Sequence, residues 1–175
     1  ATASSSNPPD LYPGVQGMVS CLACHSEFAG YGGPGGVSLE GLPARYVPGE
    51  IYTMTMTVKQ PGAKSFGFQL YAVDQEGKQA GSLSGDPVDL DARRRKGVTF
   101  LKQSYHGSHG QDSRSYSFQW RAPEDPSARV GFVAEAIGAD GHGSSMGDHV
   151  YRLEAVVTSD GSAGMAAAPG GANTD

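Results

Sequence analysis

The stretch that decides the fold is Tyr52-Thr53-Met54-Thr55-Met56-Thr57-Val58-Lys59. Apolar side chains stand at every second position of this stretch, with threonines and one lysine between them. Successive side chains of a β-strand point to opposite faces, so the alternation is typical of a strand with one buried and one solvated face. We therefore expect a half-buried strand over residues 52–59, in which Met54 and Met56 fill the core and do not bind metal.

The same alternation recurs along the chain. Residues 66–72 repeat it after the turn Gln60-Pro61-Gly62, and residues 116–120 repeat it before Ala122-Pro123. Two further strands are expected over residues 129–137 and 149–157, with a glycine-rich stretch between them. Short strands between turn clusters predict an all-β chain folded as an immunoglobulin-like antiparallel β-sandwich, with Trp120 in its core and a loop-rich N-terminal segment before it.

Length and composition bound the domain organisation. The chain has 175 residues, 38% of them hydrophobic, with 26 glycines and 11 prolines. This length is sufficient for one domain with a substantial core. We expect a flexible N-terminal arm over residues 1–12, one domain over residues 13–160, and a low-complexity Ala/Gly/Pro tail over residues 161–175.

Charge and hydropathy exclude several partner classes. The net charge of −5 and the pI near 5.5 argue against nucleic acid, because phosphate binding needs a concentrated positive field. No apolar run approaches the ~18 residues of a membrane-spanning helix, so we expect no transmembrane segment. The chain begins at Ala1 and not at methionine, which favours an exported protein, periplasmic or extracellular, with its signal peptide removed.

The sequence Cys21-Leu22-Ala23-Cys24-His25 has the pattern that attaches a c-type haem. Two thiols at this spacing can each form a thioether with one haem vinyl group, and the next residue places an imidazole beneath the iron. This interpretation makes Cys21 and Cys24 the covalent anchors of one haem c and His25 its proximal ligand.

Three other interpretations of the two cysteines stay open. A thioredoxin-like redox pair needs a following helix, which the glycine-rich flanks disfavour. A disulfide between two cysteines so close in sequence closes a very small loop and stabilises little. A zinc site needs two of the five histidines, and no second pair has a suitable spacing except the loosely matching His106 and His109.

Five short motifs occur in an order that resembles the reeler-like β-sandwich family of secreted proteins, and in particular its bacterial choice-of-anchor V members. They span roughly residues 18–158 and comprise Cys21-Leu22-Ala23-Cys24-His25, Tyr46-Val47-Pro48-Gly49-Glu50-Ile51-Tyr52, Phe66-Gly67-Phe68-Gln69-Leu70, Phe118-Gln119-Trp120-Arg121-Ala122-Pro123 and Gly147-Asp148-His149-Val150-Tyr151. The resemblance implies the reeler-like sandwich and an extracytoplasmic setting more firmly than any activity. It also implies a histidine before the Phe-x-Trp-x-Ala-Pro motif, a position that His106 matches best and His109 matches second.

The sixth ligand of the iron would decide the mechanism. We expect His106, with Met146 and His109 as alternatives; methionine ligation would raise the reduction potential. The remaining candidates are His142, His149 and a vacant position that would admit a substrate or gas. Asp148 is a candidate to hydrogen-bond a ligand histidine, although an Asp before a strand is more commonly part of a turn.

Residues 93–96, the sequence Arg93-Arg94-Arg95-Lys96, form the sole basic run of the chain. Such a run is ordinarily a solvated turn, and the alternative is a docking patch for an acidic redox partner.

The sequence as a whole therefore predicts an exported mono-haem cytochrome. We expect it to pass single electrons between redox protein partners, either as a separate protein or as part of a larger electron-transfer complex. It would be an electron-transfer protein and not an enzyme. Two alternatives come from other classes. One is a non-haem secreted β-sandwich interaction or adhesion module with a local disulfide, and the other is an open-site haem enzyme or gas sensor.

Overall fold

The computed structural model describes residues 20–25, 27–28, 30–126, 129–142 and 147–161. Within these residues the chain forms strands and two short 3-10 turns. The turns are η1 (Cys21–Ala23) and η2 (His106–Ser108), and the strands are β1 (Gly36–Glu40), β2 (Arg45–Tyr46), β3 (Ile51–Lys59), β4 (Ser65–Val73), β5 (Ser82–Gly85), β6 (Leu90–Arg95), β7 (Val98–Gln103), β8 (Ser113–Arg121), β9 (Arg129–Ala139) and β10 (His149–Ser159).

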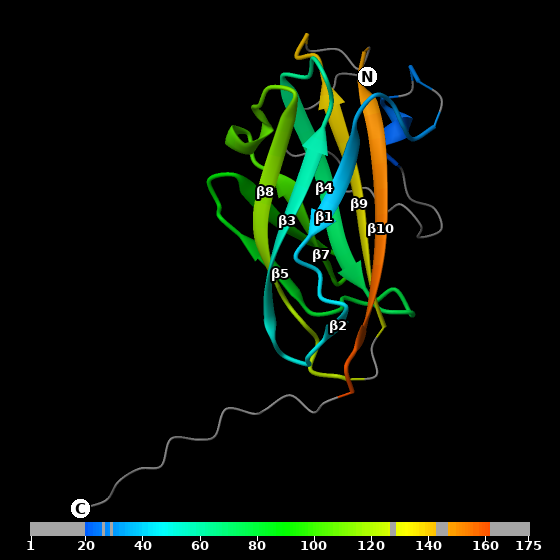
Figure 1. Ribbon diagram of the computed structural model, residues 1–175, viewed down its shortest axis with the longest axis vertical. Coiled ribbons are helices and arrows are strands. Elements are labelled where there is room, and N and C mark those ends of the chain that lie inside the picture. The colour runs from blue at the N-terminus through cyan, green and yellow to red at the C-terminus, as the bar shows by residue number, and fades with distance from the viewer. Residues whose placement is uncertain (1–19, 26, 29, 127–128, 143–146, 162–175) are drawn as a thin grey trace, which may run out of the picture.

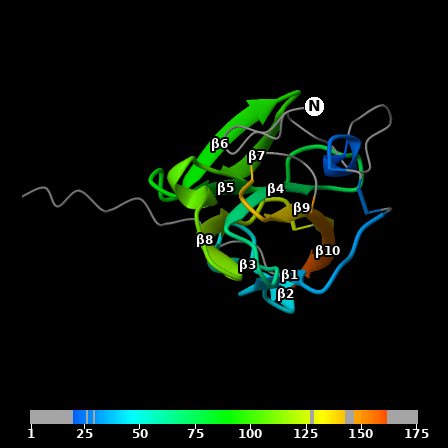
Figure 2. The ribbon, with the colours of Figure 1, turned by 90° about the horizontal axis from the view of Figure 1, so that it is seen from above.

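The strands build two sheets that pack face to face (Figure 1). A four-stranded sheet has the order β1-β3-β8-β5, and a six-stranded sheet has the order β2-β10-β9-β4-β7-β6. Figure 2 shows the two layers from above, with β6 and β7 on the side away from β1 and β2. The predicted all-β sandwich is confirmed.

Strand β3 confirms the alternation from which the fold was predicted. Met54, Met56 and Val58 are fully buried, whereas Thr53 and Lys59 on the other face are exposed. The neighbouring strand β8 pairs with β3 in antiparallel register, with Tyr52 opposite Trp120 and Met54 opposite Phe118. The apolar faces of both strands therefore point to the same side of the sheet, into the core.

Trp120 lies at the centre of this core, as predicted. Its ring meets Phe132 of the opposite sheet edge-on at 4.9 Å and Tyr46 at 5.6 Å between ring centroids. Its indole N–H donates to the Ala80 carbonyl at 3.1 Å, so the one polar atom of the ring is satisfied in the interior. Complete burial of such a ring is among the largest single apolar contributions to folding.

The outer face of the six-stranded sheet is also buried in part. Tyr71, Val98 and Phe100 form a second apolar cluster there. Beside this cluster, Glu135 and Lys102 are each 1% exposed. A carboxylate and an ammonium are buried this deeply only where partners satisfy them, so this face positions polar contacts as well as apolar ones.

The sequence patterns located five strands and missed five. Strands β3, β4, β8, β9 and β10 lie where alternation predicts them, and β9 and β10 each extend two residues beyond the predicted ends. Most missed strands are short or polar, and β2 adds a parallel pairing to an otherwise antiparallel sheet, with Arg45 beside Thr158 and Tyr46 beside Ser159. Such pairings depend on residues far away in sequence, which local periodicity does not report.

The predicted arm over residues 1–12 lies outside the described residues, as does the predicted tail after residue 161. Both stay predictions, together with the domain limits. Among the residues that the structure describes, no helix is long and apolar enough to cross a membrane.

Candidate functional site

The segment that carries the two cysteines packs on the outer side of β9 and β10. Turn η1 begins after Ser20, whose hydroxyl accepts a hydrogen bond from the Leu22 amide at 3.0 Å. Cys21 is 5% exposed and packs against Val150 and Ile137, whereas Cys24 is exposed. The two cysteines are free thiols, and they lie in opposite environments.

A buried carboxylate on β9 holds this turn in place. Glu135 accepts hydrogen bonds from the Cys21 amide at 2.8 Å, from the Tyr31 hydroxyl, and from the Arg152 guanidinium at 3.3 Å. Burial, together with the Glu135 charge, raises the pKa of the Cys21 thiol well above its usual value. Cys21 therefore stays protonated at neutral pH and is a poor nucleophile and a poor metal ligand.

His25 contacts a buried carboxylate of its own. Its Nδ1 lies 2.7 Å from Oδ2 of Asp148, which is 1% exposed and stands just before β10. The other oxygen of this carboxylate, Oδ1, is buried without a hydrogen-bond partner in the described part of the chain. Asp148 thus bonds a histidine, the less favoured of the two interpretations drawn from the sequence, and the contact fastens the N-terminal segment to β10.

Backbone contacts continue the attachment toward β1. The Gly32 amide donates to the Val150 carbonyl at 2.9 Å, and the Gly35 amide donates to the Tyr151 hydroxyl at 3.1 Å. Gly35 passes so close to β3 that a Cβ built on it would lie 1.8 Å from the Lys59 carbonyl oxygen. Only glycine fits there, so Gly35 allows the chain just before β1 to pass close to β3.

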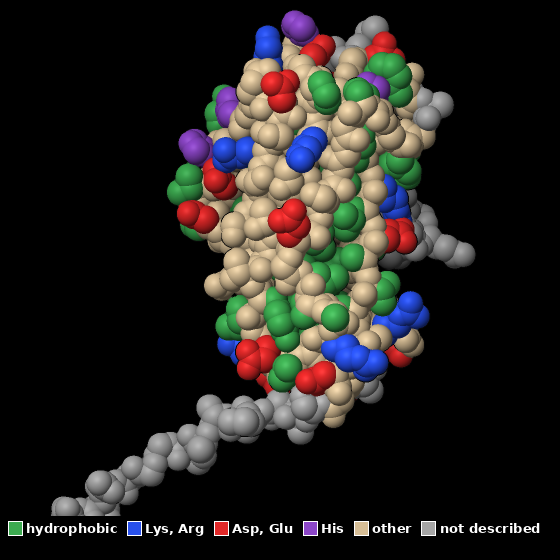
Figure 3. Space-filling view, viewed as in Figure 1, with side chains coloured by type: hydrophobic (Ala, Val, Ile, Leu, Met, Phe, Trp, Pro, Cys, Tyr) green, Lys and Arg blue, Asp and Glu red, His purple; other side chains and the backbone are tan. Residues whose placement is uncertain are grey.

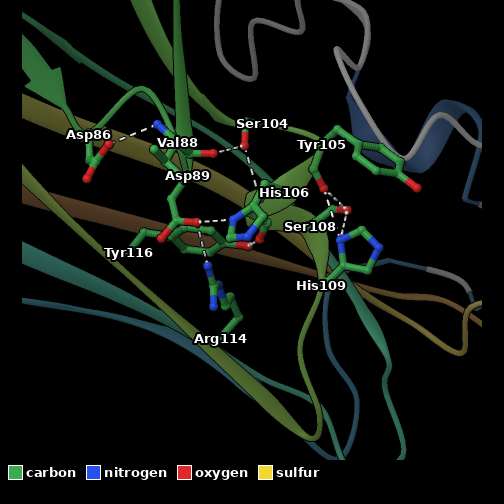
Figure 4. A network of polar contacts seen from close by, with 11 residues as sticks. Asp86, Val88, Asp89, Ser104, Tyr105, His106, Ser108, His109, Arg114 and Tyr116 are labelled. Carbon is green, nitrogen blue, oxygen red and sulfur yellow. Dashed lines mark hydrogen bonds and ion pairs between the residues drawn. The ribbon is translucent and has the colours of Figure 1, made fainter.

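Two of the residues predicted as the sixth iron ligand, His106 and His109, lie at η2 and directly after it, between β7 and β8 (Figure 4). Nδ1 of His106 lies 2.9 Å from Oδ1 of Asp89, and the same oxygen accepts from Arg114 at 2.7 Å. His109 directs its Nδ1 to the Tyr105 carbonyl at 3.1 Å. Both imidazoles thus make contacts that hold the η2 turn. Met146 lies outside the described residues.

The polar residues under η2 complete this network. The Tyr116 hydroxyl donates to the Gly107 carbonyl at 2.9 Å, and the Ser104 hydroxyl donates to the Val88 carbonyl at 2.6 Å. Figure 4 shows these groups converging from the loop before β6, from η2 and from β8. The arrangement explains why His106 and His109 are where they are without any bound group.

The basic run occupies a different place from the one expected. Arg93, Arg94 and Arg95 belong to strand β6, and only Lys96 and Gly97 form the turn, with φ of 47° and 83°. These two residues join β6 to β7, and strand β6 is the last strand of the six-stranded sheet. The run therefore lies along a sheet edge.

The register shows which backbone groups of β6 face outward. In a hairpin with a two-residue turn, the flanking residues form a hydrogen-bonded pair, here Arg95 with Val98, and pairs alternate from there. Ala92 and Arg94 are then in non-hydrogen-bonded positions, with their N–H and C=O directed away from β7. The Leu90 amide, two residues earlier, fits this register because it donates outward to the Asp86 carbonyl at 2.8 Å.

The outer face of the four-stranded sheet is the other broad surface. Threonines of β3 lie beside serines of β8, and the Thr57 and Ser115 hydroxyls are 2.8 Å apart. Figure 3 looks onto this face, which carries few charged side chains. Two grooves of about 570 and 410 Å³ lie along it, and no histidine or cysteine lines either of them.

Comparison with known proteins bears on the fold. No family model and no curated protein sequence matches the chain. The solved structure of the human F-spondin reeler domain is similar, with 20% identity, a TM-score of 0.50, and coverage of 74% of this chain and 91% of that one. The chain has a reeler-like fold. A second structure, the Reelin-N domain of F-spondin, agrees, with 20% identity, a TM-score of 0.51, and coverage of 74% and 88%.

The reeler-like sandwich predicted from the order of motifs is thus confirmed, and the haem attached to it is wrong. The described residues include no group of three or more His, Cys, Asp or Glu side chains that could hold a metal ion. The two F-spondin structures named above support the sandwich fold. The prediction of a mono-haem cytochrome, with its haem c and its electron-transfer role, is therefore wrong.

The physical reason lies in the surroundings of the motif. The spacing of residues 21–25 permits two thioethers, but Cys21 is packed against β9 and β10 and is not open to a haem vinyl group. Spacing alone cannot report this burial, which comes from residues more than a hundred positions away. A signal that could have been noticed is the single carboxylate Glu135 within the apolar strand over residues 129–137.

Proposed function

We propose that this chain is an exported, non-haem interaction module that binds a protein partner through β6, the strand that ends the six-stranded sheet within the described residues. The observation that carries the proposal is strand β6, which ends the sheet and directs the backbone groups of Ala92 and Arg94 outward. An edge strand is a template on which another polypeptide can pair, and strand addition is a recurrent mode of peptide recognition.

The disposition of the reactive side chains supports binding over catalysis. His25, His106 and His142 each contact a carboxylate that lies close by, at 2.7, 2.9 and 2.8 Å. Cys21 is buried and protonated. The contact of His25 fastens a segment to β10, the contact of His106 joins η2 to the loop before β6, and the contact of His142 lies within one exposed turn. The grooves on the four-stranded sheet are lined by residues other than histidine and cysteine. A binding module needs none of these reactive side chains, because it acts through the other parts of its surface.

Site-specific photo-crosslinking in producing cells tests this function. A photoreactive amino acid at Ala92 lies on the proposed edge. The same amino acid lies on the four-stranded sheet when placed at Thr55, and in β2, at the opposite edge of the six-stranded sheet, when placed at Arg45. We expect a discrete adduct from Ala92 and none from Arg45. The partner, once identified from the adduct, should bind the purified domain saturably.

Two results would contradict the proposal. An equal ladder of products from Ala92 and Arg45 would show only random collision. An adduct confined to Thr55 would place the partner on the outer face of the four-stranded sheet, where threonines and serines lie side by side, and would show that β6 is not the binding edge.

A further inference from the structure

Strand β6 and the turn after it carry a concentrated positive charge. Four of the 13 lysines and arginines of the chain are consecutive at residues 93–96, and all four are exposed. The chain as a whole has a net charge of −5, so this run stands out against the rest of its surface. A positive strip on an acidic protein raises the local concentration of acidic partners and orients them.

The cations flank the edge on both sides of the sheet. Arg93 pairs across the hairpin with Phe100, which belongs to the outer apolar cluster. Arg94 pairs with Thr99 and projects to the opposite side, because neighbouring side chains of a strand alternate. A segment lying along β6 would therefore meet positive charge above and below its backbone.

The backbone between these cations is suited to a polypeptide. The outward N–H and C=O groups of Ala92 and Arg94 present donors and acceptors at the spacing of a β-ladder. An extended peptide offers the complementary acceptors and donors at the same spacing, whereas a sulfated glycan or a polyphosphate does not alternate donors and acceptors at the spacing of a β-ladder. A second copy of this chain is also disfavoured, since pairing β6 with β6 would place arginines opposite arginines.

We infer that β6 receives an extended acidic segment of a partner protein as an added strand, held by backbone pairing at Ala92 and Arg94 and by ion pairs to Arg93, Arg94 and Lys96. This inference rests on the proposed function and names the chemistry of its partner. The competing explanation is that charged side chains on β6 merely keep sheets from joining edge to edge.

A peptide titration with the purified domain tests the inference. The probe is a capped ten-residue peptide of alternating glutamate and threonine, because threonine favours an extended backbone. Its control has the same sequence with an N-methyl group on every backbone amide, which keeps the charge and removes the donors from both edges of the strand. We expect saturable binding of the first peptide that weakens with salt, and at least tenfold weaker binding of the methylated one.

Two variants separate charge from backbone pairing. The double variant Arg93→Ser/Arg94→Ser should weaken binding roughly tenfold, as expected for two partly exposed ion pairs. Arg45→Ser, which removes an exposed charge from β2 at the opposite edge of the same sheet, should leave binding unchanged. Ala92→Pro removes one outward N–H without altering charge, and proline is tolerated on the open side of an edge strand. It should weaken binding at least fivefold with an unchanged circular dichroism spectrum.

Each other outcome overturns the inference in a recognisable way. Equal binding of the two peptides, or of heparin at matched charge, would mean a polyanion site without strand pairing. No peptide binding, together with self-association of the Arg93→Ser/Arg94→Ser variant, would mean that the arginines only protect the edge. If the cellular partner still crosslinks to Ala92 in that case, the interaction module stands and only its acidic, strand-forming partner is wrong.

Discussion

Cys21 and Cys24 share one motif and differ in their surroundings. Cys21 packs against Val150, and its thiol pKa is raised by burial and by the Glu135 charge, whereas Cys24 is exposed. Thiolate fraction and access together set the rate at which a cysteine reacts. The reactivity of the two residues therefore reports whether the N-terminal segment is docked as described.

We predict that, in the native protein at pH 8, iodoacetamide alkylates Cys24 and leaves Cys21 unmodified. Peptide mass mapping after a timed reaction measures this directly. In denaturant both cysteines should react at similar rates. Equal labelling of the two cysteines without denaturant would show that η1 does not pack on β9 and β10.

Glu135 should be the residue whose loss loosens this segment most. Glu135→Ala leaves the Tyr31 hydroxyl, the Cys21 amide and the Arg152 guanidinium without their shared acceptor. Removing one partner from such a buried set typically costs about 3 kcal/mol of unfolding free energy. Urea denaturation measures the loss, and Cys21 should become open to alkylation at the same time.

The matched control is Glu154→Ala, which removes an exposed carboxylate that also contacts Arg152. Exposed ion pairs contribute less than about 1 kcal/mol, so this variant should unfold nearly as the wild type does. A cost for Glu154→Ala equal to that for Glu135→Ala would contradict the role assigned to the buried carboxylate.

At the scale of elements, the sequence could predict those strands that have one buried apolar face and one more exposed face. The apolar side chains of β3, β4 and β8 recur at every second position, and burial on one face produced that pattern. Strand β6 has Asp91 and three arginines in six residues and forms because β7 lies beside it. Its place at the sheet edge, on which the proposed function depends, is a tertiary property that no local pattern contains.

The candidate site was predictable only in its parts. The contact between Asp148 and a histidine was only the less favoured of two interpretations, because an Asp before a strand is more commonly part of a turn, and the order of the motifs predicted the sandwich. The burial of Cys21 was not anticipated, because Glu135 and Val150 are distant in sequence. A motif defined by spacing specifies which atoms could react and leaves open whether the fold exposes them.

The turn between β6 and β7 offers a test at this scale. Lys96 has a φ of 47°, in the left-handed region that costs free energy for most side chains, and Gly97 follows at 83°. Asn-Gly is the preferred pair for such a turn. We predict that Lys96→Asn stabilises the protein by about 0.5 kcal/mol and that Gly97→Ala destabilises it by about 1 kcal/mol, both measured by urea denaturation. Destabilisation by Lys96→Asn together with no loss of stability in Gly97→Ala would show that the hairpin has another turn.

At the scale of the whole molecule, a tyrosine is buried on each side of the six-stranded sheet. Tyr71 lies on its outer face, and Tyr116 of β8 lies in the core between the two sheets. Burial raises the pKa of Tyr71, in the outer cluster, to about 12, and burial also raises the pKa of Tyr116, in the main core. The folded state therefore holds phenol protons that the unfolded chain releases near pH 10. This contribution to stability is complete below pH 10 and is lost as the pH rises from 10 toward 12.

We predict that the unfolding free energy falls between pH 9 and pH 11 by on the order of 1 kcal/mol for each such tyrosine. Tyr71→Phe should reduce this fall, since phenylalanine has no proton to release. Urea denaturation at both pH values, for wild type and variant, gives the comparison. Identical pH dependence of the two proteins would show that Tyr71 is not buried in solution.

The central claim is that the molecule is a non-haem reeler-like interaction module whose cysteine segment is packed into the fold. The most direct measurement is the intact mass and absorption spectrum of the protein exported from a host that matures c-type cytochromes. The account predicts the mass of the polypeptide alone and no absorption beyond that of its aromatic residues. A mass increased by one haem, with visible absorption that survives denaturation and acid–acetone extraction, would contradict it.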